Sequence, residues 1–180
     1  MDVGVLPGID PIVAEMGGGS GRNWFWVIKR ASCCIFVTKP EVGHMIYIKR
    51  KEQFCAAHKL WNDKWDAETN KRIFGKCSNE NYHGHNFDLE VTVKGEIDPE
   101  TGFVMNLFDL KQIIREHVID VVDHKNFNLD IDFMAGKMPT AEVIAMEFWK
   151  ILAPKITPYN AVLHKIVLAE TNNNIIEYYG

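Results

Sequence analysis

Apolar and polar residues alternate along two stretches of the chain, which predicts two long β-strands. In residues 84–97 the apolar side chains occupy every second position, at Phe87, Leu89, Val91 and Val93. Successive side chains of a strand point to opposite faces, so this spacing indicates a strand with one buried face. Residues 45–58 carry apolar runs at both ends and predict another strand. We expect an irregularity near Lys51, and His58 ends this strand.

The pattern changes to a helical period in the middle of the chain. Apolar side chains recur three and four positions apart at Leu110, Ile113, Ile114, Val118, Val121 and Val122. This spacing predicts an amphipathic helix over residues 107–122, with Asn106 as its N-cap. Farther along, Pro139 and Thr140 introduce a second helix over about residues 141–152.

The end of the chain returns to strand patterns. Residues 161–170 and 175–179 predict two strands joined by a hairpin loop over residues 171–174. Residues 59–76 show no clear period, and we interpret them as a loop with a helical turn. The order of elements is therefore β-β-α-α-β-β. That order predicts an α+β domain with an antiparallel sheet and both helices on one face.

Residues 1–41 differ in composition from the rest of the chain. Residues 17–21, Gly-Gly-Gly-Ser-Gly, have the composition of a flexible linker, and the apolar cluster at residues 24–28 stands alone. We expect an extension, largely disordered, that precedes a domain spanning residues 42–180. The sequence assigns no function to this extension.

Composition and charge narrow the class of protein. The 180 residues predict one domain with a sizeable core. The net charge of −4 argues against nucleic acid as a partner, and the basic run at residues 49–51 is expected to lie at a solvated edge. No stretch approaches the roughly 20 continuous apolar residues of a membrane span, and residues 1–11 do not predict a secretory signal. The four cysteines show no disulfide-framework spacing, so we expect a reducing, cytoplasmic setting.

Two histidines open the strand over residues 84–97 and suggest a metal site. His83 and His85 are two positions apart, so both rings point to one side of a strand, and Gly84 leaves the space between them open. Zinc binds such imidazoles at about 2.0–2.1 Å. His58 completes a facial set if the first two strands pair, and three histidines leave one zinc position open for a substrate oxygen. The alternative is that these histidines are structural or exposed.

Cys77 has two interpretations. As a fourth ligand it would close the metal site and make that site structural. As a free thiol it would act as a base, but a pKa of about 8.5 requires help from a neighbour at neutral pH. Asp123 and His124 are adjacent in the sequence, and a His held by an Asp is a common proton carrier. Alternatively, His124 only complements the end of the preceding helix.

Glu170 ends an apolar strand and also has two interpretations. Its carboxylate is either exposed at the strand end or accepts two N–H bonds from a flat heterocycle. The spacing of the residues does not separate these alternatives.

Eight segments, in order along the chain, carry a family resemblance. They are residues 54–60, 75–86, 95–99, 104–107, 109–111, 123–126, 139–142 and 170–174. Together they resemble the 6-pyruvoyl-tetrahydropterin synthases, and the match runs from about residue 46 to residue 179. Residues 1–40 lie outside the resemblance.

The resemblance implies a T-fold subunit, in which a four-stranded antiparallel sheet carries two helices on one face. It also implies a homohexamer of two stacked trimers, with the sheets closed into a barrel and the active sites between subunits. Closure would remove exposed sheet edges. The implied reaction converts 7,8-dihydroneopterin triphosphate to 6-pyruvoyl-tetrahydropterin, with elimination of triphosphate, in tetrahydrobiopterin synthesis.

The resemblance also implies roles for the residues singled out above. His58, His83 and His85 resemble zinc ligands, one ion per subunit, and Cys77 resembles the base that removes a proton from the substrate. Such a metal would hold side-chain oxygens of the pterin and acidify the adjacent C–H bond.

Four further residues have implied roles. Asp123 and His124 resemble a relay beside the thiol, supplied by a neighbouring subunit. Glu170 resembles the pterin anchor, with a part in charge relay, and Thr140 would help at the ring. Magnesium would help with the triphosphate, although no residues identify its site.

Two other functions compete with this one. A sister group with the same fold makes 6-carboxy-tetrahydropterin for queuosine synthesis, and it typically has three residues between its cysteine and the His-Gly-His. Here five residues, 78–82, intervene, which favours the pyruvoyl enzyme. A catalytically silent T-fold protein that binds pterin would lack a ligand, the thiol or the relay, yet every expected position is filled.

Overall fold

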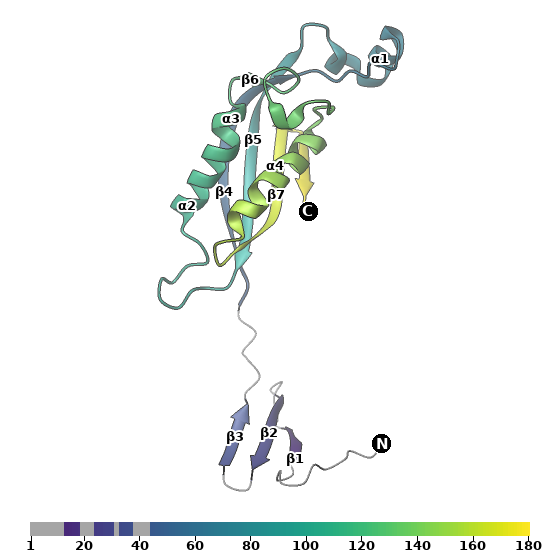
Figure 1. Cartoon of the computed structure of the whole chain (residues 1–180). Coiled ribbons are helices and arrows are strands. Elements are labelled where there is room, and N and C mark those ends of the chain that lie inside the picture. The colour runs from purple at the N-terminus through teal and green to yellow at the C-terminus, as the bar shows by residue number, and fades with distance from the viewer. Residues whose placement is uncertain (1–12, 19–23, 31–32, 38–43) are drawn as a thin grey trace, which may run out of the picture. The chain divides into compact units, whose positions relative to one another are not determined.

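The structure is a computed structural model of the chain, and it describes residues 13–18, 24–30, 33–37 and 44–180 (Figure 1). The chain divides into two compact units, residues 1–43 and residues 44–180. The sequence analysis placed this division between residues 41 and 42.

The first unit contains a small antiparallel sheet. Its strands are β1 (Val13–Gly18), β2 (Trp24–Arg30) and β3 (Cys33–Val37), in that order across the sheet. These strands occupy positions for which the sequence predicted disorder. The rest of the extension lies outside the described residues, so its disorder stays a prediction.

The second unit is built on a mixed five-stranded sheet (Figure 1). Four strands run antiparallel, namely β4 (Ile46–His58), β5 (His83–Gly95), β7 (Val162–Thr171) and β8 (Asn174–Tyr178). They are the four strands that the sequence predicted. The register between β4 and β5 runs without a shift, so the irregularity expected near Lys51 was wrong. A shift occurs instead between β5 and β7, at Thr92 and Val93.

The fifth strand corrects the predicted four-stranded sheet. β6 (Lys125–Asn126) pairs in parallel with Ala56 and Ala57 at the edge of β4. A strand of two residues has no hydrophobic period, so periodicity could not reveal it.

Two helical stretches cover one face of the sheet, which confirms the predicted α+β class (Figure 1). The first stretch comprises α2 (Leu107–Ile114), a π-helical turn (Arg115–Ile119) and α3 (Asp120–Val122). The second is α4 (Ala141–Ile156), whose 16 residues extend past the predicted end at residue 152. Pro154 lies in the last turn of α4. None of the helices in the described part of the chain is long and apolar enough to cross a lipid bilayer.

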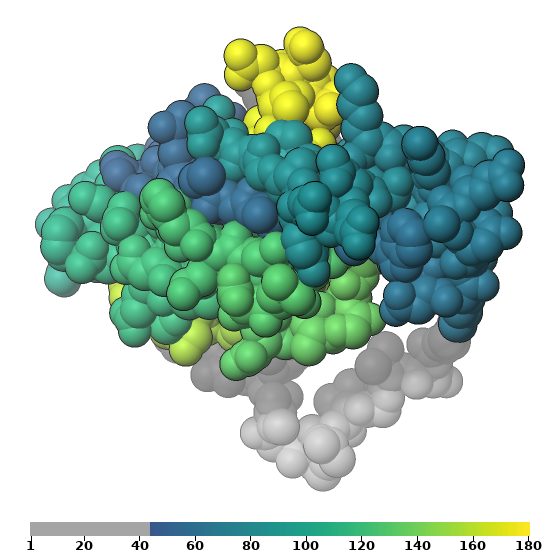
Figure 2. All heavy atoms as spheres, turned by 90° about the horizontal axis from the view of Figure 1, so that it is seen from above, coloured from purple at the N-terminus to yellow at the C-terminus, as the bar shows by residue number. Residues whose placement is uncertain are grey.

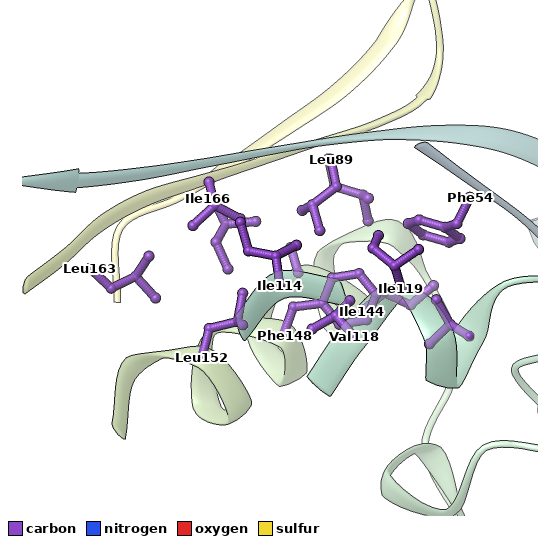
Figure 3. Close-up of a cluster of buried hydrophobic side chains, with 14 of the residues drawn as sticks. Phe54, Leu89, Ile114, Val118, Ile119, Ile144, Phe148, Leu152, Leu163 and Ile166 are labelled. Carbon is purple, nitrogen blue, oxygen red and sulfur yellow. The ribbon is translucent and has the colours of Figure 1, made fainter. Parts of the chain in front are cut away.

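The core lies between the sheet and these helices (Figure 3). Phe54 of β4 and Phe87 of β5 are register partners, and their rings stack with centroids 5.0 Å apart. Ile144, Phe148 and Leu152 of α4 are fully buried against this face. The odd-numbered residues of β5 therefore point into the core, as their alternation predicted.

The segment between β4 and β5 contains a longer helix than the single helical turn that was predicted for residues 59–76. Helix α1 (Ala67–Phe74) is followed by a 3-10 turn (Gly75–Ser78). Within α1, Asn70 is the buried residue, so the helix carries almost no apolar stripe for a periodicity argument to detect. Asp66 caps the helix by accepting a hydrogen bond from the Thr69 N–H.

Asn70 organises the turn before this helix. Its side-chain oxygen accepts from the Asn62 N–H at 2.8 Å. Its amide nitrogen lies 3.0–3.2 Å from the carbonyl oxygens of Asn62, Trp65 and Asp66. Because Asn70 is fully buried, these backbone groups have little water to replace it.

We expect Asn70→Ala to destabilise the 59–78 segment by about 2 kcal/mol, because buried backbone groups lose their partner. Amide hydrogen exchange should report faster exchange in this segment and little change in β5. Asn81→Ala is the control, because the Asn81 side chain is exposed. Equal protection in the Asn70 and Asn81 variants would contradict the organising role.

Candidate active site

The pairing of β4 with β5 brings three histidines together at one end of the core. His58 is the register partner of His83, and Ala56 is the partner of His85. All three rings therefore lie on the face that also carries Phe54 and Phe87. The His58 ring centroid is 4.4 Å from that of His83 and 5.3 Å from that of His85. One ring nitrogen from each histidine lies within 4.8 Å of the others.

The hydrogen bonds around these rings test whether they fit a metal ion. His58 Nδ1 lies 2.8 Å from the Pro139 carbonyl oxygen, so this nitrogen carries the proton and Nε2 keeps a free lone pair. The Nε2 atoms of His58 and His85, and both ring nitrogens of His83, are buried without a hydrogen-bond partner in the described structure. Buried polar atoms normally have partners. A divalent cation bound by three imidazole nitrogens would satisfy one nitrogen of each ring.

Burial also favours the form of histidine that binds metals. Desolvation lowers the pKa of His58 and, likewise, the pKa of His83. Both rings are therefore biased toward neutral imidazole, the form that coordinates a cation.

Gly84 has a different role from the one predicted. A Cβ atom at Gly84 would lie 3.2 Å from the Ala56 carbonyl oxygen. Its hydrogen therefore allows close approach of the β4 backbone. The space between the two imidazoles follows from the alternation of the strand.

Cys77 lies in the 3-10 turn and lines the same cavity as His83 and His85. It does not belong to the close group of metal-binding atoms formed by the described histidines. Desolvation raises the pKa of the Cys77 thiol, and the negative charge of Glu170 raises it further. A cationic or basic partner is therefore needed to make the thiolate at neutral pH.

Glu170, near the end of β7, points at the histidine group. One carboxylate oxygen, Oε1, lies 3.2 Å from His58 Nε2 and 3.7 Å from His85 Nε2. The side chain is 18% exposed, so it is a partly buried carboxylate at the mouth of the site. Its role as the pterin anchor stays a prediction.

His83, His85, Cys77 and Glu170 line one cavity of about 1190 Å³. Its other wall is formed by the segment between β4 and β5, including Lys59 and Trp61. Figure 2 views this end of the second unit, where the blue and teal residues of that segment lie beside green residues that precede α4. The cavity is large enough for a nucleotide-sized ligand.

Asp123 and His124 form the predicted pair, but at the sheet edge and not among the residues lining this cavity. Asp123 Oδ2 lies 3.0 Å from His124 Nδ1, and Asp123 Oδ1 accepts from the Cys55 N–H at 2.8 Å. That Cys55 bond is the main reason why the pKa of Asp123 is lowered, and the His124 bond adds to it. The His124 side chain is 81% exposed and its backbone has φ of +60°, a conformation unusual for a residue other than glycine.

Thr140 serves the fold in this chain. Its hydroxyl accepts a hydrogen bond from the Val143 N–H at 3.3 Å and so caps α4. It is not among the residues that line the cavity, and its predicted contact with the pterin ring stays a prediction.

Sequence reasoning missed two parts of the site. The Pro139 carbonyl orients His58, but a backbone atom leaves no signal in the sequence. Lys59 lines the cavity, and its position next to a candidate ligand could have pointed to it.

Comparisons with known proteins agree with this geometry. A family model described as 6-pyruvoyl tetrahydropterin synthase matches residues 47–180. The curated 6-pyruvoyl tetrahydrobiopterin synthases of Pongo abelii and Homo sapiens are 45% and 44% identical over 133 residues, covering 74% of this chain and 90% of theirs. The solved structure of Caenorhabditis elegans 6-pyruvoyl tetrahydropterin synthase has a TM-score of 0.70 at 36% identity, covering 77% of this chain and 97% of that one.

The sheet, its covering helices and the three-histidine centre define a T-fold enzyme subunit. The chain belongs to the 6-pyruvoyl tetrahydropterin synthase family, whose model matches nearly the whole second unit.

We expect His83→Ala to weaken zinc binding about 100-fold or more, because removing a ligand exceeds the loss typical of a supporting residue. Metal analysis after dialysis against a chelator measures the effect. His164→Ala is the control, because His164 packs against Tyr47 and Tyr179 outside the histidine group. Full zinc retention by the His83 variant would contradict the assigned centre.

Proposed function

We propose that the protein is a zinc-dependent lyase that converts 7,8-dihydroneopterin triphosphate to 6-pyruvoyl-tetrahydropterin and triphosphate, in tetrahydrobiopterin biosynthesis. The proposal rests on one arrangement in a member of this family. Three clustered histidines have ring nitrogens without a hydrogen-bond partner, and two of them, His83 and His85, line a cavity together with a thiol and a carboxylate.

The metal would be held by His58, His83 and His85, with one position open to substrate. When bound, zinc supplies a positive charge that polarises oxygens of the substrate side chain. An all-imidazole ligand set suits zinc and is a poor match for magnesium, which prefers oxygen ligands. A magnesium ion that accompanies the triphosphate would therefore bind elsewhere.

The chain's own groups would carry the proton steps. The Cys77 thiolate would take the proton from a side-chain carbon of the pterin as triphosphate leaves, so one C–H and one C–O bond break. Because burial and Glu170 both raise the thiol pKa, the base must be activated. Asp123 and His124 are the groups suited to that task.

The outward position of Asp123 and His124 supports an active site shared between subunits. In this chain the pair lies at the β4 edge, beside β6, and does not line the cavity. β8 forms one edge of the sheet. At the opposite side, the outer edge of β4 is paired with the short strand β6 at Ala56 and Ala57. Joining such edges in a closed ring of subunits would build a barrel, and two trimers would form the proposed hexamer.

The carboxy-pterin synthase remains the second candidate. The five residues between Cys77 and His83 form a turn in which the Tyr82 N–H donates to the Asn79 carbonyl oxygen at 3.2 Å. Tyr82 takes a φ of +64° to enter β5. This longer connection favours the pyruvoyl enzyme.

The test of the proposed function is triphosphate release from 7,8-dihydroneopterin triphosphate, with the pteridine product identified by mass. We expect chelation of zinc to abolish release, and Cys77→Ala to reduce kcat at least about 100-fold, as for loss of a catalytic base. Cys55→Ala is the matched control, because that thiol is exposed and does not line the cavity. Full activity of the Cys77 variant would exclude the thiolate base, and a carboxylated product would transfer the assignment to the second candidate.

Mixing two inactive variants tests the shared site. We expect Cys77→Ala and His124→Ala to be impaired separately, and their co-expression to restore activity at roughly a quarter of the sites, because random assembly pairs an intact thiol with an intact neighbouring His. The measurement is the specific activity of the purified mixed assembly. Activity no higher than that of the separate variants would place both residues in a single subunit's site.

A further inference from the structure

We propose that Lys59, with Lys71 and Lys76, forms the subsite that binds the triphosphate of the substrate. This inference rests on the proposed function, because it assigns the triphosphate end of that substrate to one wall of the cavity. The three lysines line the same cavity as Cys77, His83 and His85.

The two walls of the cavity differ in net charge. The segment between β4 and β5 contributes three lysines and the Glu80 carboxylate, so its lining residues are positive on balance. β7, on the histidine side, contributes the Glu170 carboxylate. A substrate with a neutral ring at one end and several negative charges at the other matches this division.

The charges of these lysines are not neutralised within the described chain. Lys49, Lys51, Lys137, Lys150 and Lys165 each lie within 4.0 Å of a carboxylate oxygen. Among residues 44–180, no such ion pair involves Lys59, Lys71 or Lys76. Three ammonium groups around one cavity repel each other until an anion binds between them. Lysine is a common phosphate ligand for this reason.

Lys59 is the best positioned of the three. Its backbone N–H donates to Asn128 Oδ1 at 2.8 Å, and its carbonyl oxygen accepts from Asn128 Nδ2 at 3.0 Å. The next residue, Leu60, donates its N–H to the Cys77 carbonyl oxygen at 2.9 Å. Lys59 is therefore fixed between the metal ligand His58 and the turn that carries the thiol.

Two aromatic rings contact the ammonium group of Lys59. Its Nζ lies 5.4 Å from the Trp61 ring centroid and 5.1 Å from the Tyr82 ring centroid. Such cation–π contacts hold an ammonium group without neutralising its charge. Tyr82 is one of two non-glycine residues with positive φ among the described residues, and that backbone turn places its ring beside Lys59. The strained turn between Cys77 and β5 thus contributes to the subsite.

At these positions the lysines would act both when the substrate binds and when the triphosphate leaves. They would hold the triphosphate away from the histidine group and offset the negative charge that grows on the leaving oxygen as the C–O bond breaks. Loss of Lys59 is therefore expected to raise KM for the triphosphate ester and also to lower kcat.

The experiment uses the zinc-loaded full-length protein and compares Lys59→Met with Lys59→Arg and Lys64→Met. The last variant removes an equal charge from an exposed lysine that does not line the cavity. Four quantities are measured: KM and kcat for 7,8-dihydroneopterin triphosphate, the inhibition constant of 7,8-dihydroneopterin, and the affinity for inorganic triphosphate by calorimetry.

For Lys59→Met we expect KM to rise about tenfold and the affinity for inorganic triphosphate to fall by a similar factor, as for loss of one charged contact. The inhibition constant of the unphosphorylated pterin should not change. Lys59→Arg should recover most of the loss, and Lys64→Met should match the wild type.

Two results would overturn the subsite. In the first, the Lys59→Met variant has a KM and an affinity for inorganic triphosphate that are both within twofold of the wild-type values. The other is an equal rise in KM and in the inhibition constant of the unphosphorylated pterin, which would place Lys59 at the ring or in the fold. If the wild-type protein releases no triphosphate, the proposed function fails, and the calorimetric comparison alone decides on the subsite.

Discussion

The in-register pairing of β4 with β5 is the constraint on which the site depends. It places His58 opposite His83 and puts His85 on the same face. The same register stacks Phe54 on Phe87 and seats both in the core. A slip of one residue would turn every side chain of one strand to the other face, so that the core and the grouping of the three histidines would be lost together. The hydrophobic stripe of the sheet thus fixes the geometry of the histidines.

The start of helix α4, on the other side of the core, also orients one of the histidines. α4 begins where Thr140 caps its first turn, and the preceding Pro139 carbonyl accepts the proton of His58 Nδ1. The start of a core helix thereby selects which nitrogen of a candidate ligand faces the centre. Across the cavity, Asn70 and Asn128 hold the segment that carries Lys59 and Cys77. Two side-chain amides, buried in Asn70 and exposed in Asn128, hold this segment through its backbone groups.

Much of this arrangement could be predicted from the sequence, because it follows from strong periodic patterns. Alternation in β5 predicts its buried face, and the spacing of His83 and His85 follows from the same alternation. Helical spacing predicts α2 to α3 as one stretch and α4 as another. α4 extends to Ile156, past the predicted end at residue 152, and Pro154 lies in its last turn.

The remaining features have no periodic pattern in the sequence. β6 comprises two residues, α1 is a mostly exposed helix, and the contact of Pro139 with His58 is made by a backbone atom. The position of Asp123 and His124 depends on tertiary pairing with the Cys55 backbone. Adjacency in sequence predicted their mutual contact, but it could not predict on which side of the sheet edge they lie.

X-ray absorption at the zinc edge of the zinc-loaded protein tests the central claim most directly. We predict imidazole nitrogen ligands at about 2.0–2.1 Å and no sulfur ligand, because Cys77 is the proposed base. A zinc–sulfur distance of about 2.3 Å, lost in Cys77→Ala, would show a closed site that contains the thiol and would contradict the account.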